Sequence, residues 1–162
     1  MKTADLPINY NICEILECNL EHRANKTALL SEHGSLTFRE VSDQVNQVGN
    51  ALTRLGVRFG DCVAILCPDR PEWVTTFFAV AKIGGVAFGM NTMLKTDEYD
   101  YILKDARVRV LVIYDGLLAL VEPILSKHST LSKIIVIGGD GGANYTTFTE
   151  WIDGEDIKLA TS

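Results

Sequence analysis

The chain has 162 residues, 47% of them hydrophobic and 22% charged, so it can bury one substantial core and has the composition of a globular protein rather than a disordered one. Fifteen lysines and arginines stand against 21 aspartates and glutamates, a formal net charge of -6. This balance disfavours a general binder of nucleic acid or of anionic membranes, because both need a basic face on the protein. We expect a single domain over residues 1–162. Since neither a membrane-spanning apolar run nor a signal-peptide pattern is found, we also expect a cytoplasmic location.

The first third of the chain predicts a helix, a β-hairpin and a second helix. Apolar residues recur at helical spacing from Ile12 to Leu20, and two short apolar segments around a glycine turn are typical of a hairpin over 27–38. Thr37 and Glu40 are spaced as a capping box, and Gly56 stands where a C-terminal cap is expected. The helix between these caps has the clearest periodicity in the chain, at intervals of 4, 3, 4 and 3: Val41, Val45, Val48, Leu52 and Leu55.

Strands and helices alternate in the rest of the chain. Helices are expected from Pro71, from a cap at Thr96, and from Leu117 to Ser126, and Thr147 with Glu150 predicts a capping box for a short last helix. This alternation indicates right-handed crossovers and an α/β fold, with a largely parallel sheet flanked by helices and preceded by an N-terminal helix and β-hairpin. The expected strands are 63–66, 86–90, 108–114 and 134–137.

Four cysteines occur in two pairs with the same spacing, Cys13 with Cys18 and Cys62 with Cys67. A zinc site with four thiolates would use closer pairs within tight turns. The first pair is expected on a helix but off one face, and the second on a strand with its side chains on opposite faces. We therefore favour buried free thiols over a metal site.

Residues that could carry chemistry are few. The glycine-rich run from Gly138 to Gly142 follows a strand, but Asn144 stands where a dinucleotide fingerprint needs its third glycine, and no Walker-type lysine follows. A surface loop is the expected structure. The histidines, His22, His33 and His128, fall in separate elements, and no Gly-x-Ser-x-Gly motif supports a catalytic triad.

The stretch LTFREVSDQVNQVGNALTRLGVRFGDCVAILCPDRPEW, from Leu36 to Trp73, resembles the N-terminal region of acyl-CoA synthetases, adenylation domains and luciferases. The segment from Phe77 to Asn91 is similar to the family's helix, Gly-Gly turn and strand. NTMLKTDEYDYILKDARVRVLVI, from Asn91 to Ile113, most resembles the benzoate- and hydroxybenzoate-CoA ligases. The resemblance implies a partial, N-terminal subdomain of the adenylate-forming ligase fold.

The resemblance also implies a reaction in two steps. A carboxylate attacks the α-phosphate of Mg-ATP and gives an acyl-adenylate and pyrophosphate; the thiol of coenzyme A then displaces AMP. The full-length enzyme would use ATP, Mg²⁺, coenzyme A and a small-molecule carboxylate, with an aromatic acid favoured. The family's phosphate-binding loop and its later motifs have no counterpart between Met1 and Ser162. We therefore transfer no catalytic residue, and we expect this chain alone to be inactive and to bind none of these ligands.

One turn matches a family turn near the coenzyme A channel. It runs from Asn91 to Lys95, and Met93 and Lys95 are the candidate contacts of coenzyme A, with Lys95 the only cation in the turn. A solvated lysine at the start of a helix is the competing interpretation.

Two readings of the whole chain stay open. The first is the N-terminal part of an aryl- or acyl-CoA ligase, and the alternative is a truncated interaction module without catalysis. In the family this region packs against a second sheet-containing subdomain, so we expect the isolated chain to expose apolar surface and to self-associate. The carboxylate substrate is not set by these residues, because the family builds its acyl pocket mostly from later ones.

Overall fold

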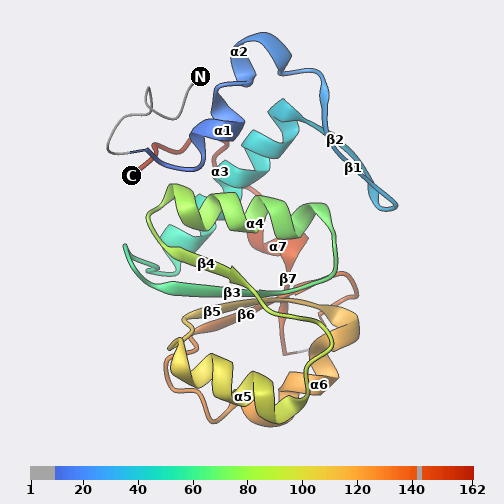
Figure 1. Ribbon diagram of the computed structural model, residues 1–162, viewed down its shortest axis with the longest axis vertical. Coiled ribbons are helices and arrows are strands. Elements are labelled where there is room, and N and C mark those ends of the chain that lie inside the picture. The colour runs from blue at the N-terminus through green and yellow to red at the C-terminus, as the bar shows by residue number, and fades with distance from the viewer. Residues whose placement is uncertain (1–9, 142–143) are drawn as a thin grey trace.

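The computed structural model describes residues 10–141 and 144–162, which form an α/β fold with helices on both faces of one sheet (Figure 1). A separate two-stranded hairpin stands beside it, formed by β1 (Thr27–Ser31) and β2 (Gly34–Thr37). The sheet has five strands: β3 (Cys62–Leu66), β4 (Val86–Gly89), β5 (Val110–Tyr114), β6 (Lys133–Ile137) and β7 (Thr146–Thr147). The helices are α1 (Glu14–Glu17), α2 (Leu20–Arg23), α3 (Phe38–Arg54), α4 (Pro71–Lys82), α5 (Thr96–Asp105), α6 (Asp115–Leu125) and α7 (Phe148–Ile152).

The sheet is parallel throughout, in the order β4-β3-β5-β6-β7. The central strands β3 and β5 are almost wholly buried, because helices cover both of their faces. Their pairing sets Val63 beside Val110 and Leu66 beside Ile113. The parallel sheet expected from the alternation of strands and helices is confirmed.

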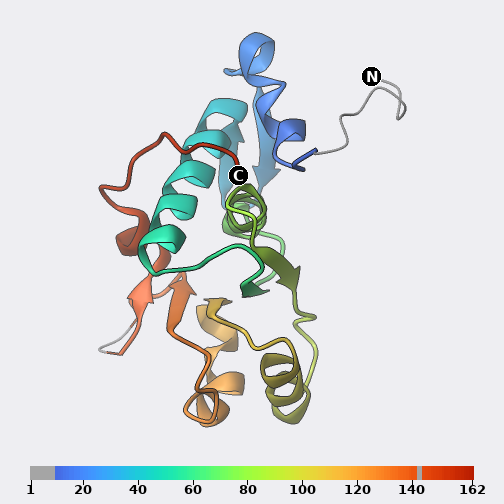
Figure 2. The same ribbon diagram turned by 90° about the vertical axis from the view of Figure 1, so that its left-hand side faces the viewer.

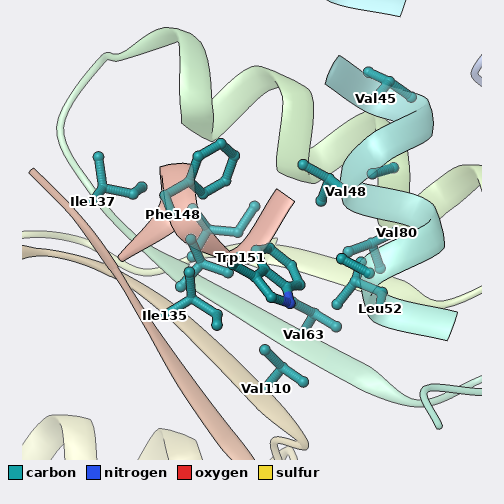
Figure 3. Packing of buried hydrophobic residues seen from close by; sticks show 14 of the residues in the cluster. Val45, Val48, Leu52, Val63, Val80, Val110, Ile135, Ile137, Phe148 and Trp151 are labelled. Atoms are coloured by element: carbon teal, nitrogen blue, oxygen red, sulfur yellow. The ribbon is translucent and has the colours of Figure 1, made fainter. Parts of the chain in front are cut away.

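The core on one face of the sheet lies beneath α3, α4 and α7 (Figures 1 and 3). Its side chains come from helices and strands that are far apart in the sequence, and the Phe148 and Trp151 rings of α7 meet edge to face at 5.9 Å between centroids. Figure 3 shows the packing of Val45, Val48, Leu52, Val63, Val80, Val110, Ile135, Ile137, Phe148 and Trp151.

A second core lies on the opposite face, against α5 and α6. Tyr99 of α5 is fully buried there, and its hydroxyl donates to the carbonyl oxygen of Asn91 at 2.9 Å. Alternate residues of each central strand point to the two cores: Val63 and Ile65 belong to the first, Ala64 and Leu66 to the second.

Local signals account for the ends of α3. Thr37 Oγ1 accepts the amide hydrogen of Glu40, while the Glu40 carboxylate accepts from Thr37, so the expected capping box is present. Gly56 has φ +79°, the left-handed conformation that ends a helix. The same reciprocal box, from Thr147 and Glu150, opens α7 as expected.

The structure corrects three details of the sequence prediction. The expected helix from Ile12 to Leu20 is two short helices, α1 and α2, because the Asn19 side-chain amide donates to the Ile15 carbonyl oxygen at 2.8 Å and competes with the helical bond there. The cap of α5 is Lys95 rather than Thr96, whose hydroxyl instead donates to the Leu120 carbonyl oxygen at 2.9 Å. Strand β7 was not expected.

No helix among residues 10–141 and 144–162 has the length and apolar character needed to cross a membrane.

Candidate functional site

The carboxyl ends of the parallel strands meet along one edge of the sheet. The chain winds outward from β3 to β4 over one face with α4, and from β5 to β6 over the other face with α6 (Figure 1). The winding direction therefore reverses between β3 and β5. In open parallel sheets, ligands bind outside the strand ends at such a reversal, which makes this edge the candidate site.

Arg70 occupies the reversal point. It follows β3, and its guanidinium carbon lies 5.4 Å from the centroid of the Tyr114 ring at the end of β5. Nε lies 3.4 Å from Glu72 Oε2, and Nη1 lies 3.1 Å from Nε2 of His33 in the hairpin turn. The side chain is only 16% exposed. Its cationic plane is thus held in place by an aromatic ring, a carboxylate and an imidazole.

This cluster was missed by the sequence analysis, which gave Arg70 no role and placed His33 apart from any candidate site. Their 37-residue separation leaves no local signal. The topology was the usable signal: because β3 and β5 are parallel neighbours, the segments that carry Arg70 and Tyr114 lie at the same edge of the sheet.

Two cavities flank Arg70, one beside the hairpin and α4 and one beside the hairpin turn and α7. The first has a volume of about 320 Å³ and is mainly apolar, and the second has about 260 Å³ and more polar lining. The first is lined by Leu29, Leu30, Ser31, Asp69, Arg70, Pro71, Trp73 and Val74.

The turn from Asn91 to Lys95 follows β4 at the same edge. Its backbone is fixed at both ends: Asn91 Oδ1 accepts the Met93 amide hydrogen at 2.9 Å, and Glu98 Oε2 accepts that of Lys95 at 2.8 Å. Met93 is 88% exposed, and Lys95 is exposed as well. Within the described part of the chain, the Lys95 ammonium makes no ion pair. The turn thus presents a thioether and a free cation on a rigid backbone.

An open groove of about 580 Å³ runs between the ends of β3 and β4 into this turn. Trp73 closes one side, with its indole against Gly89, where a Cβ would lie 3.0 Å from the ring. Cys67 also lines the groove, but burial, and then the charge of Glu72, raise the pKa of its thiol to about 12. A thiol with that pKa is protonated at neutral pH and does not serve as a nucleophile.

The glycine run after β6 forms a tight turn over the start of α6. Gly138 and Gly139 have φ +77° and +60°, and a Cβ on Gly139 would lie 2.6 Å from the Asp115 carboxylate. Residues 138–141 lead to β7 rather than to a helix that could hold a phosphate at its N-terminus. Gly142 lies outside the described residues.

The histidines and cysteines have separate surroundings. Nε2 of His128 lies 2.9 Å from Asp100 Oδ1, and exposed His22 lies 3.6 Å from Glu21. All four cysteines are free thiols, but only Cys13 and Cys67 are buried as expected, because Cys62 is half-buried and Cys18 is exposed. Across residues 10–141 and 144–162, no three His, Cys, Asp or Glu side chains gather as metal ligands would.

Comparison with known proteins finds relatives along nearly the whole chain. Benzoate–CoA ligase of Thauera aromatica is 37% identical over 139 residues, which cover 84% of this chain and 26% of that protein. The 3-hydroxybenzoate–CoA/4-hydroxybenzoate–CoA ligase of the same species is 32% identical, covering 83% of this chain and 26% of the relative. The chain thus spans about a quarter of the length of these curated relatives.

A solved structure shares the fold. The anthranilate CoA ligase AuaEII, in complex with anthranoyl-AMP, matches with a TM-score of 0.96 and 49% identity, covering 100% of this chain and 31% of that one. The expected likeness to the N-terminal region of the adenylate-forming ligase fold is confirmed. The family model described as AMP-binding enzyme matches residues 16–159, and this chain therefore belongs to the AMP-binding enzyme family.

Proposed function

We propose that this chain is the N-terminal part of an ATP-dependent, AMP-forming carboxylate–CoA ligase that acts on an aromatic acid. The observation that carries the proposal is the 37% identity to a benzoate–CoA ligase, supported by the 49% identity to an anthranilate CoA ligase. Crotonobetaine/carnitine–CoA ligase of Escherichia coli is less similar, at 27% identity, which favours an aromatic over an aliphatic acid.

In this proposal, residues 1–162 form one N-terminal subdomain of a longer ligase. The complete enzyme joins the carboxylate to AMP, releases pyrophosphate, and transfers the acyl group to the thiol of coenzyme A. Chemistry of this kind depends on positioning and on charge stabilisation around phosphates rather than on a protein nucleophile. The high pKa of the Cys67 thiol agrees with a reaction that needs no nucleophile from the protein. We assign no residue of the described chain to Mg²⁺.

The Asn91–Lys95 turn would contribute to coenzyme A binding. Its backbone is already ordered, so a ligand that contacts Met93 or Lys95 does not have to order the loop first. The Lys95 ammonium can attract a phosphate of coenzyme A, and the exposed Met93 side chain offers an apolar, polarizable contact to its pantetheine arm.

The isolated chain is expected to be inactive and to bind neither ATP nor coenzyme A tightly. The test incubates purified chain with Mg-ATP, coenzyme A and benzoate or anthranilate, and measures AMP and pyrophosphate. Release should equal that of a no-protein control. Release that is clearly higher, and that persists after repeated purification, contradicts the assignment of catalysis to segments outside residues 1–162. A cytoplasmic location and self-association of the isolated chain belong to the same proposal.

A chimera tests whether the chain can take its proposed place in a ligase. Residues 16–159 would replace the matching segment of the Thauera aromatica benzoate–CoA ligase, with benzoate-dependent AMP release as the measurement. We expect activity above that of a control chimera carrying Val110→Asp, which puts a charge into the core between β3 and β6. A chimera that folds with a native melting transition but releases no AMP would contradict the proposal.

A further inference from the structure

The last ten residues, 153–162, form an extended strap that returns from α7 along α3 to reach α4 and α1 (Figure 2). It contains no regular secondary structure, so its backbone groups are left to bond with the helices or with water. Both views show the end of the strap beside α4, close to the segment that holds α1 (Figures 1 and 2).

A polar track on α3 holds the strap. Its residues Asn46, Asn50 and Arg54 are four apart and so lie on one side of the helix. The Asn46 amide donates to the carbonyl oxygen of Ile157 at 2.7 Å, and the Asn50 amide donates to those of Asp156 and Lys158 at 2.7 and 3.1 Å. Arg54 Nε donates to Glu155 at 2.7 Å. The two asparagines therefore bind the strap backbone at three successive residues, 156–158, and Arg54 binds the side chain of Glu155.

The far end of the strap contacts a buried lysine. Lys82, at the end of α4, is only 3% exposed. Its ammonium donates to Asn46 Oδ1 at 2.8 Å and pairs with Glu17 of α1. The amide nitrogen and the hydroxyl of Ser162 both donate to the Lys82 carbonyl oxygen at 2.9 Å. One residue thus contacts α1, the α3 track and the end of the strap.

Residues 11–17, here called the α1 segment, contact the same end of α4. The Cys13 thiol, fully buried, donates to the Phe78 carbonyl oxygen of α4 at 2.9 Å, and the Asn11 amide donates to that of Ala81. If α1 moved away, Lys82 would lose an anionic partner while it stayed buried. If the strap moved away, Glu17 would lose the Thr161 hydroxyl, which donates to its carboxylate at 3.5 Å. Each departure therefore removes a hydrogen-bonding or charged partner from the contact that remains.

We propose that the α1 segment and the strap open and close together as one unit, with Lys82 as the residue that couples them. The two segments are more than 100 residues apart in the sequence, and this coupling follows from their common contacts with Lys82 and Glu17 and not from the ligase reaction. The α1 segment and the strap would thus open together by local unfolding while the sheet stays folded.

The test uses two chemical reporters in the intact chain. Tryptic cleavage after Lys158, which is exposed but bound along α3, reports opening of the strap. Alkylation of Cys13, located by peptide mass mapping, reports opening of α1. Cys67, buried beside the sheet, serves as an internal reporter of opening elsewhere.

The decisive variant is Asn50→Ala, because Asn50 bonds to the strap and has no bond to α1. Gln47→Ala is the matched control, an amide of the same helix for which no bond to the strap exists in the described structure. We expect Asn50→Ala to accelerate both Lys158 cleavage and Cys13 alkylation about tenfold, the effect of losing about 1.4 kcal/mol of hydrogen bonding. Gln47→Ala should change neither rate.

A second variant, Lys82→Met, should accelerate both reactions further and leave Cys67 alkylation unchanged. Faster cleavage with unchanged Cys13 alkylation in Asn50→Ala would overturn the proposal, because the strap would then open alone. Unchanged rates for both reporters would overturn it as well, as would an equal acceleration at Cys67, which would mean global rather than local opening.

Discussion

Single residues at the carboxyl edge of the sheet are constrained by close contacts that sequence patterns do not reveal. The glycine run after β6 invites a phosphate-loop interpretation, yet Gly138 and Gly139 are required by backbone conformation and by the proximity of Asp115. Arg70 is likewise constrained by Tyr114, Glu72 and His33, none of which a local motif would have connected.

The steric role of Gly139 can be measured against another left-handed glycine. Gly154→Ala introduces only backbone strain, since nothing lies within 4 Å of the new Cβ at φ +73°, and should lower the free energy of unfolding by about 1 to 2 kcal/mol. Gly139→Ala adds a clash with the Asp115 carboxylate and should cost about 1 kcal/mol more. Urea denaturation of both variants gives the comparison; equal losses would show that Asp115 yields without cost.

Lys95 offers a test of ligand contact without a structural side effect. Because its side chain is exposed, Lys95→Ala should change the free energy of unfolding by less than about 0.5 kcal/mol. In the complete ligase it should raise KM for coenzyme A and leave KM for ATP unchanged. Lys104→Ala, an exposed lysine of α5, is the control. If both variants have the wild-type KM for coenzyme A, Lys95 is an ordinary solvated lysine.

Whole elements were predicted best where strong local signals agree with burial. Helix α3 has its capping box, its heptad-like apolar spacing and a glycine beyond its end, and four of the five expected apolar positions are buried, all except Leu55. The split of α1 from α2 and the Lys95 cap arose from side-chain hydrogen bonds, which compete with local propensity only in the folded chain. Strand β7, with two residues, is too short to show any period.

The capping box of α3 gives a prediction about stability at neutral pH. Thr37→Ala removes the acceptor for the Glu40 amide and should lower the free energy of unfolding by about 1 kcal/mol. Thr53→Ala, at an exposed position of the same helix whose hydroxyl only bonds back to the Gly49 carbonyl oxygen, should change it by less than about 0.5 kcal/mol. Equal effects in chemical denaturation would argue against a special role of the cap.

The same box predicts a pH dependence. Hydrogen bonds from the Thr37 backbone, and then from its side chain, hold the pKa of Glu40 below its usual 4.5. A lowered pKa in the folded state means that this stabilisation is present above pH 4.5 and is lost as the pH falls through the folded-state pKa. Glu40→Gln should therefore show a shallower loss of stability below pH 4.5 than the wild type. Parallel pH profiles would contradict this.

At the scale of the molecule, the sequence predicted the α/β class and the parallel sheet, because alternating elements leave few topologies open. It did not predict the edge cluster around Arg70 or the strap along α3, since both depend on contacts between distant segments. The side chains that hold the strap, Asn46 and Asn50, lie on the polar side of α3, where a sequence pattern predicts only contact with water, and only the folded chain shows what they bind.

Self-association is a prediction for the molecule as a whole. Leu30, Phe59 and Met93 are each more than 80% exposed, and β4 lies at the edge of the sheet with β3 as its single partner strand. Exposed apolar side chains and a free strand edge favour contacts between copies, despite the net charge of -6. Light scattering over a dilution series should show a mass that rises with concentration. A monomer mass at high concentration would contradict the prediction.

The central claim, that this chain belongs to an aromatic-acid CoA ligase, is tested most directly on the protein encoded by the complete reading frame. That protein is incubated with Mg-ATP, coenzyme A and benzoate, anthranilate or acetate, and acyl-CoA and AMP are measured by mass spectrometry. We predict equal amounts of AMP and an aromatic acyl-CoA, with little product from acetate. A reading frame that stops at Ser162, or a complete protein that forms neither product, would contradict the claim and favour a non-catalytic interaction module.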